Sequence, residues 1–326
     1  MILINTYGYT NPQDIQTRAF IAVDPGNRFI KWFDDQNQPR IIPSYIKNLE
    51  TWEDAEPDAH SYIVELDGKR YAIGKLAQDL GGKPAFEIGK AELASILVLP
   101  SLATADGSCQ RVEKLLIPTP DTRNSEVIAL LKRLETTRDF RLNGINHICT
   151  VRTVKACNEG QSSFKLATNR NLWTYADKTN GVIDFGGGTA IARLFTSNGV
   201  LIREADTLLP GTNALAQKVG AAMLPSLGYS PDLGTIMDAI ANGSFIYGTL
   251  GNNFLPIFQT VQNAWIADIR NKLKIAWGNY LPNLGEVLMI GGTAPLMKPL
   301  QQSTHNRFKI APHPQLFSLY GLCLEA

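Results

Sequence analysis

One stretch decides the fold of this chain: Gly181-Val-Ile-Asp-Phe-Gly-Gly-Gly-Thr-Ala-Ile-Ala-Arg-Leu-Phe195. Val182 and Ile183 predict a strand, and residues 190–195 predict its partner. The three glycines between them permit a turn with no Cβ in the way, and consecutive backbone N–H groups there can face a phosphate. Asp184 is placed at the turn to hold a cation or its water. Taken alone, the stretch also fits an ordinary glycine-rich hairpin, so its interpretation depends on a second loop of the same kind.

A second such loop follows the run Ala19–Val23, which predicts a buried strand. It is Asp24-Pro-Gly-Asn-Arg-Phe-Ile-Lys31, and residues 29–33 predict the next strand. Pro25 fixes one backbone angle, and Gly26 frees another. Each loop alone fits a hairpin turn, but the repeated pattern of strand, acid, glycine turn and strand predicts two halves built alike.

Two further strand ends are candidates for chemistry. Residues 150–157 predict one strand, and Glu159 follows it, where a carboxylate can order an attacking water. A lone glutamate at a strand end is more often a solvated surface group. Residues 286–297 predict a strand, a Gly-Gly turn and a helix, an arrangement that suits an anion or a sugar phosphate. A tight turn between strand and helix would explain the same glycines.

Composition favours a folded chain of two domains. The chain has 326 residues, of which 44% are hydrophobic and 19% charged. A net charge of +1 provides no basic field for direct binding of nucleic acid. The spacing of the four cysteines and four histidines favours neither a disulfide framework nor a structural metal. The sequence has no signal-peptide pattern and no apolar run of membrane-spanning length, so we expect a cytoplasmic protein without a membrane span.

Local patterns predict several other elements. Alternation around Asp67-Gly68 and around Asn143-Gly144 predicts two hairpins. Asn124 or Ser125 is expected to cap a helix through residues 127–134. A long helix is expected over 256–277.

The order of these loops resembles the actin-like ATPase superfamily, which includes actin, Hsp70 and sugar kinases. The resemblance runs from about residue 19 to the C-terminus. The closest resemblance is to the ParM/StbA branch of bacterial actins, because of the Asp-x-Gly-x-x-x-Ile-Lys form of the first loop, a small insertion and the closing Pro-Gln helix. The matching motifs are the first phosphate loop Asp24–Lys31, the second phosphate loop Asp184–Thr189, the adenosine motif Met289–Leu296 and the second connecting helix Pro314–Gly321.

The resemblance implies an α/β actin-like fold with two similar mixed-sheet lobes and a nucleotide cleft between them. Its expected parts are an N-terminal extension (1–18), domain I (19–179 and 312–326, with subdomain IB at about 44–87) and domain II (180–311, with subdomain IIB at about 211–281).

The resemblance also implies ATP and Mg²⁺ as cofactors. Asp24 and Asp184 would hold the metal, and Glu159 would orient the hydrolytic water as the catalytic residue. The remaining implied nucleotide-binding residues are Gly26, Asn27, Lys31, Gly186, Gly187, Gly188, Thr189, Lys218, Gly291, Gly292 and Thr293.

The implied function is that of a ParM-like ATPase that polymerises head to tail into dynamic filaments. Such a protein segregates plasmid DNA through an adaptor of the ParR type, so that DNA is contacted only indirectly. Two alternatives are a cytoskeletal filament protein of the same family that serves cell shape, and a non-polymerising Hsp70-like nucleotide-dependent protein.

The sequence departs from the family pattern in places. Asn27-Arg-Phe29 replaces small or polar residues, and Arg28 would either contact phosphate or point to solvent. Ala190-Ile191 lacks an acid that often follows the second loop, and Phe317-Ser318 replaces the usual Ala-Asn of the closing helix. These departures affect the expected efficiency of hydrolysis more than nucleotide binding.

Overall fold

The structure is a computed structural model and describes residues 15–326. Most of the expected N-terminal extension, residues 1–14, lies outside this range. The described chain forms two compact units. Unit 1 comprises residues up to 117, residues 123–156 and Ala326, and unit 2 comprises residues 118–122 and 157–325. The domain boundaries implied by the family resemblance, at 179/180 and 311/312, stay a prediction.

Unit 1 is built on an eleven-stranded mixed sheet with the order β3-β2-β1-β8-β10-β9-β5-β6-β4-β7, and β11 pairs with β8. The pairs β1–β8 and β8–β10 are parallel, whereas β1–β2, β2–β3 and the pairs from β10 to β7 are antiparallel. The strands are β1 (Gln16–Pro25), β2 (Phe29–Phe33), β3 (Pro39–Pro43), β4 (Tyr45–Leu49), β5 (Ser61–Leu66), β6 (Lys69–Gly74), β7 (Lys83–Pro84), β8 (Gln110–Thr119), β9 (Thr137–Leu142), β10 (Ile145–Val151) and β11 (Val154–Asn158).

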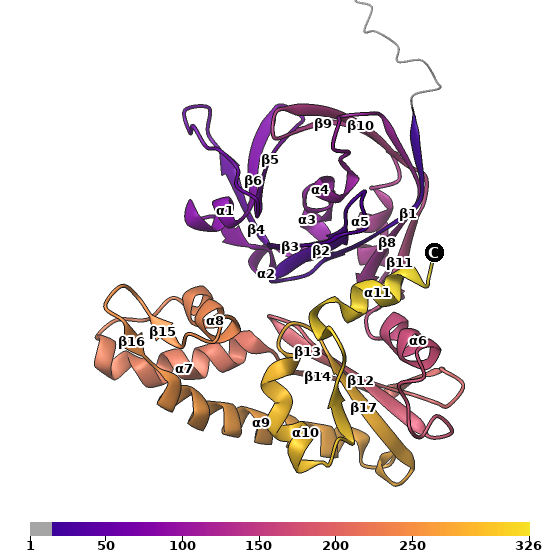
Figure 1. The fold of residues 1–326 in the computed structure, drawn as a ribbon, viewed down its shortest axis with the longest axis vertical. Helices are drawn as coiled ribbons and strands as arrows, with labels where there is room; N and C mark the ends of the chain where they lie inside the picture. The colour runs from indigo at the N-terminus through magenta and orange to yellow at the C-terminus, as the bar shows by residue number, and fades with distance from the viewer. Residues whose placement is uncertain (1–14) are drawn as a thin grey trace, which may run out of the picture. The chain divides into compact units, whose positions relative to one another are not determined.

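Short helices fill the concave side of this sheet. Strands β5, β6, β9 and β10 curve around two of them, α3 and α4 (Figure 1). Leu97, Val98 and Leu99 are fully buried there in one cluster with Trp32 and Phe140. The helices of unit 1 are α1 (Lys75–Asp79), α2 (Ala85–Ile88), α3 (Lys90–Leu97), α4 (Leu99–Leu102) and α5 (Ser125–Lys132).

Both predicted hairpins are confirmed. Asp67 and Gly68 have φ of 49° and 72°, and Asn143 and Gly144 have φ of 50° and 82°. Two successive left-handed residues give the tight turn that matches the twist of a hairpin. The helix cap is also confirmed, because Asn124 Oδ1 accepts hydrogen bonds from the N–H groups of residues 126 and 127, at 3.1 Å each.

The single strand predicted over 150–157 is wrong in one respect. Strand β10 ends at Val151, and β11 begins at Val154. Arg152 and Thr153 between them are both exposed, which breaks the alternation of a strand. The backbone still follows β8, since the N–H of Arg152 donates to the carbonyl of Val112 at 2.9 Å.

Unit 2 contains a five-stranded sheet with the order β14-β13-β12-β17-β18, in which β14–β13–β12 is antiparallel and β12–β17–β18 parallel. A two-stranded sheet, β15–β16, lies apart from it in the pairing. The strands are β12 (Thr179–Phe185), β13 (Thr189–Phe195), β14 (Leu201–Pro210), β15 (Ile246–Tyr247), β16 (Asn252–Asn253), β17 (Leu284–Ile290) and β18 (Phe308–Ile310). The helices are α6 (Gln161–Asn169), α7 (Thr212–Leu227), α8 (Leu233–Ala241), α9 (Leu255–Trp277), η2 (Leu281–Asn283), η3 (Ala294–Met297), α10 (Lys298–Ser303), η4 (Pro314–Leu316) and α11 (Phe317–Cys323).

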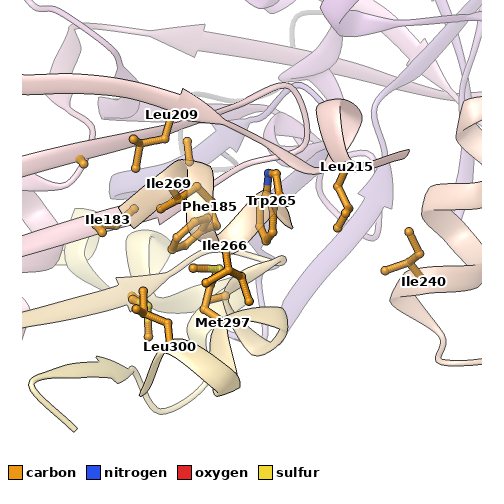
Figure 2. Close-up of a cluster of buried hydrophobic side chains, with 14 of the residues drawn as sticks. Ile183, Phe185, Leu209, Leu215, Ile240, Trp265, Ile266, Ile269, Met297 and Leu300 are labelled. Carbon is orange, nitrogen blue, oxygen red and sulfur yellow. The ribbon is translucent and has the colours of Figure 1, made fainter. Parts of the chain in front are cut away.

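The five-stranded sheet has an apolar cluster on each face. On one face, the cluster around the fully buried Trp265 joins the strands to α7, α9 and α10, and α8 packs on α7. Trp265 lies between Phe185 and Leu215 in Figure 2. Trp265 donates its Nε1–H to the carbonyl of Pro210 at 3.0 Å. On the other face, α6 and α11 pack together, and Phe164 stacks on Phe195 of β13 with ring centroids 4.5 Å apart. The predicted long helix is thus confirmed as α9, and its buried face anchors the sheet.

No helix within the described residues is long and apolar enough to cross a membrane.

Candidate nucleotide site

Asp184 lies one residue before the end of β12, and its carboxylate approaches the chain segment after β17. It is the sixth residue of β12 and pairs with Ile191 of β13 and Ile290 of β17. Gly291 follows β17 with φ of 92°, and a Cβ there would lie 2.6 Å from Asp184 Oδ1 and 2.5 Å from the carbonyl oxygen of Phe185. Only glycine can therefore occupy position 291 without displacing the carboxylate.

The glycine loop 186–188 closes the β12–β13 hairpin. The N–H of Gly186 donates to the carbonyl of Thr189 at 3.1 Å. The carbonyl of Gly187 accepts the N–H of Asn213 at 2.8 Å, so the loop is tied to the first turn of α7. Gly211, the N-cap of α7, packs on the loop so closely that a Cβ would lie 2.7 Å from the backbone nitrogen of Thr189. The loop is therefore held in one conformation by a helix N-terminus.

The Gly-Gly segment after β17 joins the same cluster. The N–H of Thr293 donates to the carbonyl of Phe185 at 3.4 Å, and its hydroxyl hydrogen-bonds the hydroxyl of Thr212. Both threonines are buried. A Cβ on Gly292 would touch the side chain of Gln315, at 3.7 Å from its Cγ. The helix expected after the glycines begins instead as the 3₁₀ segment η3, with Pro295 in its first turn.

The closing helix contributes a hydroxyl to the carboxylate. Ser318, in α11, donates from Oγ to Asp184 Oδ2 at 2.9 Å. Ser318, one of the departures from the family pattern, thus contacts Asp184 directly. Lys218 lies farther along α7 and is exposed.

Glu159 is fixed through its main chain. Its N–H donates to the carbonyl of Thr119 at 2.9 Å, and its carbonyl accepts from the guanidinium of Arg193. Gly160 follows with φ of 80° and is the N-cap of α6. Residue 159 therefore lies at the meeting point of two strand ends, β8 and β11, and a helix start.

Arg193 is a buried cation with three acceptors. Besides the carbonyl of Glu159, it binds the carbonyl of Pro120 and Asp206 Oδ2, the last from Nε at 3.3 Å. Burial raises the pKa of the Asp206 carboxyl, and the neighbouring guanidinium offsets part of that shift.

The first loop, in unit 1, is a tight hairpin between β1 and β2. Asp24 pairs with Lys31 across it, and Lys31 Nζ lies 2.9 Å from Asp24 Oδ2. Both side chains are largely buried. Ser44 donates its Oγ to the carbonyl of Gly26, and the Arg28 guanidinium lies over the ring of Phe29, 5.5 Å from its centroid. Asn27 belongs to the turn itself. Arg28 was expected to contact phosphate or to point to solvent, and in the structure its guanidinium has an aromatic partner in Phe29.

Within unit 2, the structure thus gathers Asp184, the loop 186–189, Gly291 and Thr293 into one cluster. Thr212 and Gln315 also belong to it but were not predicted, because their role depends on contacts with residues far away in the sequence. Arg193 was missed as well, although a signal existed: it is the single charge in β13, whose other residues from 190 to 195 are apolar.

The donor set fits a phosphate with a hard metal ion. A carboxylate at a strand end supplies the oxygen ligands that Mg²⁺ prefers, directly or through water. A glycine loop in front of a helix N-terminus suits an anion. The side-chain Oδ1 of Asn213 beside the loop is buried and has no hydrogen-bond partner among residues 15–326, so a polar group next to the loop is left for a ligand.

Comparison with known proteins agrees with this geometry. Residues 22–161 match the family model of the actin-like proteins' N-terminal domain. No curated protein matches the sequence. Solved structures match over nearly the full chain. An archaeal actin homologue in complex with ADP shares 14% identity at a TM-score of 0.73, covering 94% of this chain and 98% of that one.

Two ParM structures match similarly. A 15-stranded ParM filament from Clostridium botulinum shares 15% identity at a TM-score of 0.74, covering 94% of this chain and 98% of that one. The apo ParM protein of psk41 shares 17% identity at a TM-score of 0.66, covering 95% and 96%. Residues 22–161 thus match the N-terminal domain of the actin-like proteins, and the chain shares the fold of these actin homologues over almost its whole length.

Proposed function

We propose that this chain binds ATP with Mg²⁺, hydrolyses the ATP and polymerises into filaments. The observation that carries the proposal is the cluster around Asp184: a carboxylate, a glycine loop tied to the N-terminus of α7, and the glycine at 291 that leaves room for nothing larger. The ADP complex of an archaeal actin homologue of the same fold supports a nucleotide as the ligand.

In this proposal each unit supplies a phosphate loop. In unit 2, Asp184 would hold the metal, and residues 186–189 would bind phosphate oxygens through backbone N–H groups. In unit 1, Gly26 and Asn27 would contribute backbone contacts. Asp24 would act on the metal through water, because Lys31 already occupies one of its oxygens. Bound Mg²⁺ supplies charge neutralisation on the phosphates.

Gly291, Gly292 and Thr293 would line the adenosine. Gly291 packs closely against the carbonyl of Phe185, and neither glycine carries a side chain. A ligand would therefore contact the backbone of this segment. Lys218, exposed on α7, is the proposed residue beside the base.

Glu159 would orient the water that attacks the γ-phosphate. Little covalent chemistry is required of the protein in such a reaction, because positioning and electrostatic stabilisation provide most of the rate. A fixed main chain at residue 159 is what a positioning role needs, and its two backbone hydrogen bonds supply it.

The filament part of the proposal rests on the shared fold. Among solved structures of this fold, one is a 15-stranded ParM filament and another an Alp12 filament. We propose a cytoplasmic filament that assembles head to tail and moves plasmid DNA through a ParR-type adaptor. The net charge of +1 favours an indirect link to DNA.

The test is assembly and turnover of the full chain with ATP·Mg²⁺, ADP·Mg²⁺, GTP·Mg²⁺ and a non-hydrolysable ATP analogue. Filaments in electron micrographs with ATP, and phosphate release that follows assembly, are expected. Asp184→Asn should abolish the Mg²⁺-dependent part of nucleotide binding. Asp177→Asn is the matched control, because its side chain is 77% exposed on the same unit.

Different outcomes point to different members of the superfamily. Nucleotide turnover without assembly in any nucleotide or salt would refute the filament and favour an Hsp70-like, non-polymerising protein. Filaments that no DNA-bound adaptor nucleates would favour a cytoskeletal role in cell shape. Glu159→Ala should slow phosphate release and leave filaments longer-lived, and unchanged turnover would remove Glu159 from the catalytic role.

A further inference from the structure

A buried arginine holds the main chain of the proposed catalytic residue in place. Arg193 lies in β13, whose other residues from 190 to 195 are all buried and apolar, and its own side chain is only 4% exposed. Burying a guanidinium costs free energy unless its charge and its donors are satisfied. An aliphatic residue would fill this position at lower cost, so the contacts of Arg193 need an explanation beyond packing.

The guanidinium joins two chain segments that are not neighbours in sequence. One terminal nitrogen donates to the carbonyl of Glu159, just after β11, and the other to the carbonyl of Pro120, just after β8. A guanidinium presents its donors in a rigid planar fork, so one side chain fixes both carbonyls relative to each other.

A β-bulge places the counter-charge. The register between β13 and β14 shifts between Ala192 and Leu194, opposite the segment that contains Asp206. A bulge re-aims side chains, and here Asp206 Oδ2 reaches the Nε of Arg193. The guanidinium is thus held from the side of β14 while its other two nitrogens face the strand ends.

These contacts leave Glu159 little freedom. Its N–H is bound to the carbonyl of Thr119 and its carbonyl to Arg193, and Gly160 then turns the chain into α6. A Cβ on Gly160 would lie 3.7 Å from the Cδ of Arg193, so the arginine stem also packs under this turn. Removing the guanidinium frees one of the two main-chain anchors of residue 159.

We propose that Arg193 is a positioning residue for Glu159 in ATP hydrolysis, and this rests on the proposed function. Arg193 fixes the main-chain position from which the side chain of Glu159 extends, and in this proposal it does not contact the nucleotide. Loss of the fork therefore lowers kcat and leaves KM for ATP unchanged, because nucleotide binding uses other residues. A displacement of about 1 Å of a group that positions a reactant can lower a rate about 100-fold, so we expect a fall in kcat of about tenfold or more.

The experiment uses Arg193→Lys in the full chain. The ammonium keeps a positive charge beside Asp206, which protects folding, but it lacks the planar fork that binds both carbonyls. Arg307→Lys is the matched control. Arg307 also binds backbone carbonyls, those of Gly285 and Leu284 among them, at the opposite end of β17 from Gly291. Arg307→Lys should change stability without changing kcat.

Two readouts separate positioning from a general loss of structure. In a cycle with Glu159→Ala, Arg193→Lys should lower kcat in the wild-type background and have no further effect once the Glu159 carboxylate is gone. Hydrogen exchange should quicken at the amide of residue 159, now bound to the carbonyl of Thr119, in Arg193→Lys, and not in Arg307→Lys.

The outcomes are distinct. If Glu159→Ala lowers kcat and Arg193→Lys does not, or if the two effects add, the inference is overturned while the proposed function stands. If Glu159→Ala retains full turnover, the catalytic role of Glu159 is refuted and the positioning role with it. Unchanged exchange at residue 159 overturns the anchoring itself, whether or not the protein hydrolyses ATP.

Discussion

The substitution Gly291→Ala tests the central contact of the candidate site. Two separate costs follow from the structure. First, φ at residue 291 is 92°, a region in which an L-residue pays about 1–2 kcal/mol. Second, the new Cβ would lie 2.5 Å from the carbonyl oxygen of Phe185 and 2.6 Å from Asp184 Oδ1. Relieving such overlap by shifting the backbone costs about 1–3 kcal/mol more.

Gly228→Ala isolates the first cost. Gly228 ends α7 with φ of 75°, and a Cβ there would have nothing within 4 Å. The free energy of unfolding, measured by urea denaturation, should fall by about 1–2 kcal/mol for Gly228→Ala. It should fall by about 2–5 kcal/mol for Gly291→Ala, the sum of the two costs. Nucleotide affinity should fall only for Gly291→Ala, because only that Cβ displaces Asp184.

Equal destabilisation by the two substitutions would refute the argument. It would mean that the backbone at 291 relaxes without cost, so that the close approach to Asp184 does not constrain the site. An unchanged nucleotide affinity in a destabilised Gly291→Ala would show instead that Asp184 is not needed where the structure places it.

Three other predictions concern buried groups. Burial raises the pKa of the Cys149 thiol to about 11, so native Cys149 should resist alkylation at neutral pH and react once the protein is unfolded. Burial works to raise the pKa of Glu286, but the hydrogen bonds from Lys309 and from a backbone N–H outweigh it and hold the pKa below 4.5. The ionised carboxylate therefore contributes stability above pH 4.5 that is lost as the pH falls through the lowered pKa. In Glu286→Gln, the free energy of unfolding should fall less steeply as the pH is lowered through this range. Trp277→Phe leaves the carbonyl of Ala205 without the indole donor, now at 2.8 Å, and should lower the unfolding free energy in urea by about 1–3 kcal/mol.

Each of these predictions has a control. Cys109 is less buried than Cys149 and should label first in the native protein, so equal native rates would contradict the burial argument. Glu126→Gln, at an exposed position, should leave the acid limb unchanged. Ile275→Ala, on the same helix as Trp277 but 84% exposed, should change stability by no more than about 0.5 kcal/mol. A loss as large as that of Trp277→Phe would show that the helix, not the hydrogen bond, sets the cost.

Hairpin turns and long helices could be predicted from the sequence because the residue patterns that specify them are local. Asn143-Gly144 specifies its turn through the left-handed angles that both residues tolerate, whatever surrounds them. The period of α9 is likewise set by its own side chains. The prediction over 150–157 was wrong where two adjacent exposed residues break the strand, because alternation alone does not show where a strand leaves its register.

The candidate site was predicted in part. The Asp184 loop and the Gly-Gly at 291 were found from their composition, and the structure brings them together because β12 and β17 are parallel neighbours in the sheet. Their roles as ligands stay predictions. Lys218 and Glu159 stay predictions too, the first on an exposed helix face and the second fixed by its main chain.

By itself, the sequence determined the turns, the helix periods and the acid-glycine loops, since these depend on backbone preferences and on side chains close in the chain. Only the tertiary structure decided that Ser318 would donate to Asp184, that Thr212 would meet Thr293, and that Arg193 would join two strand ends. Such contacts depend on strand order, helix placement and a bulge opposite residue 193, none of which a local pattern encodes.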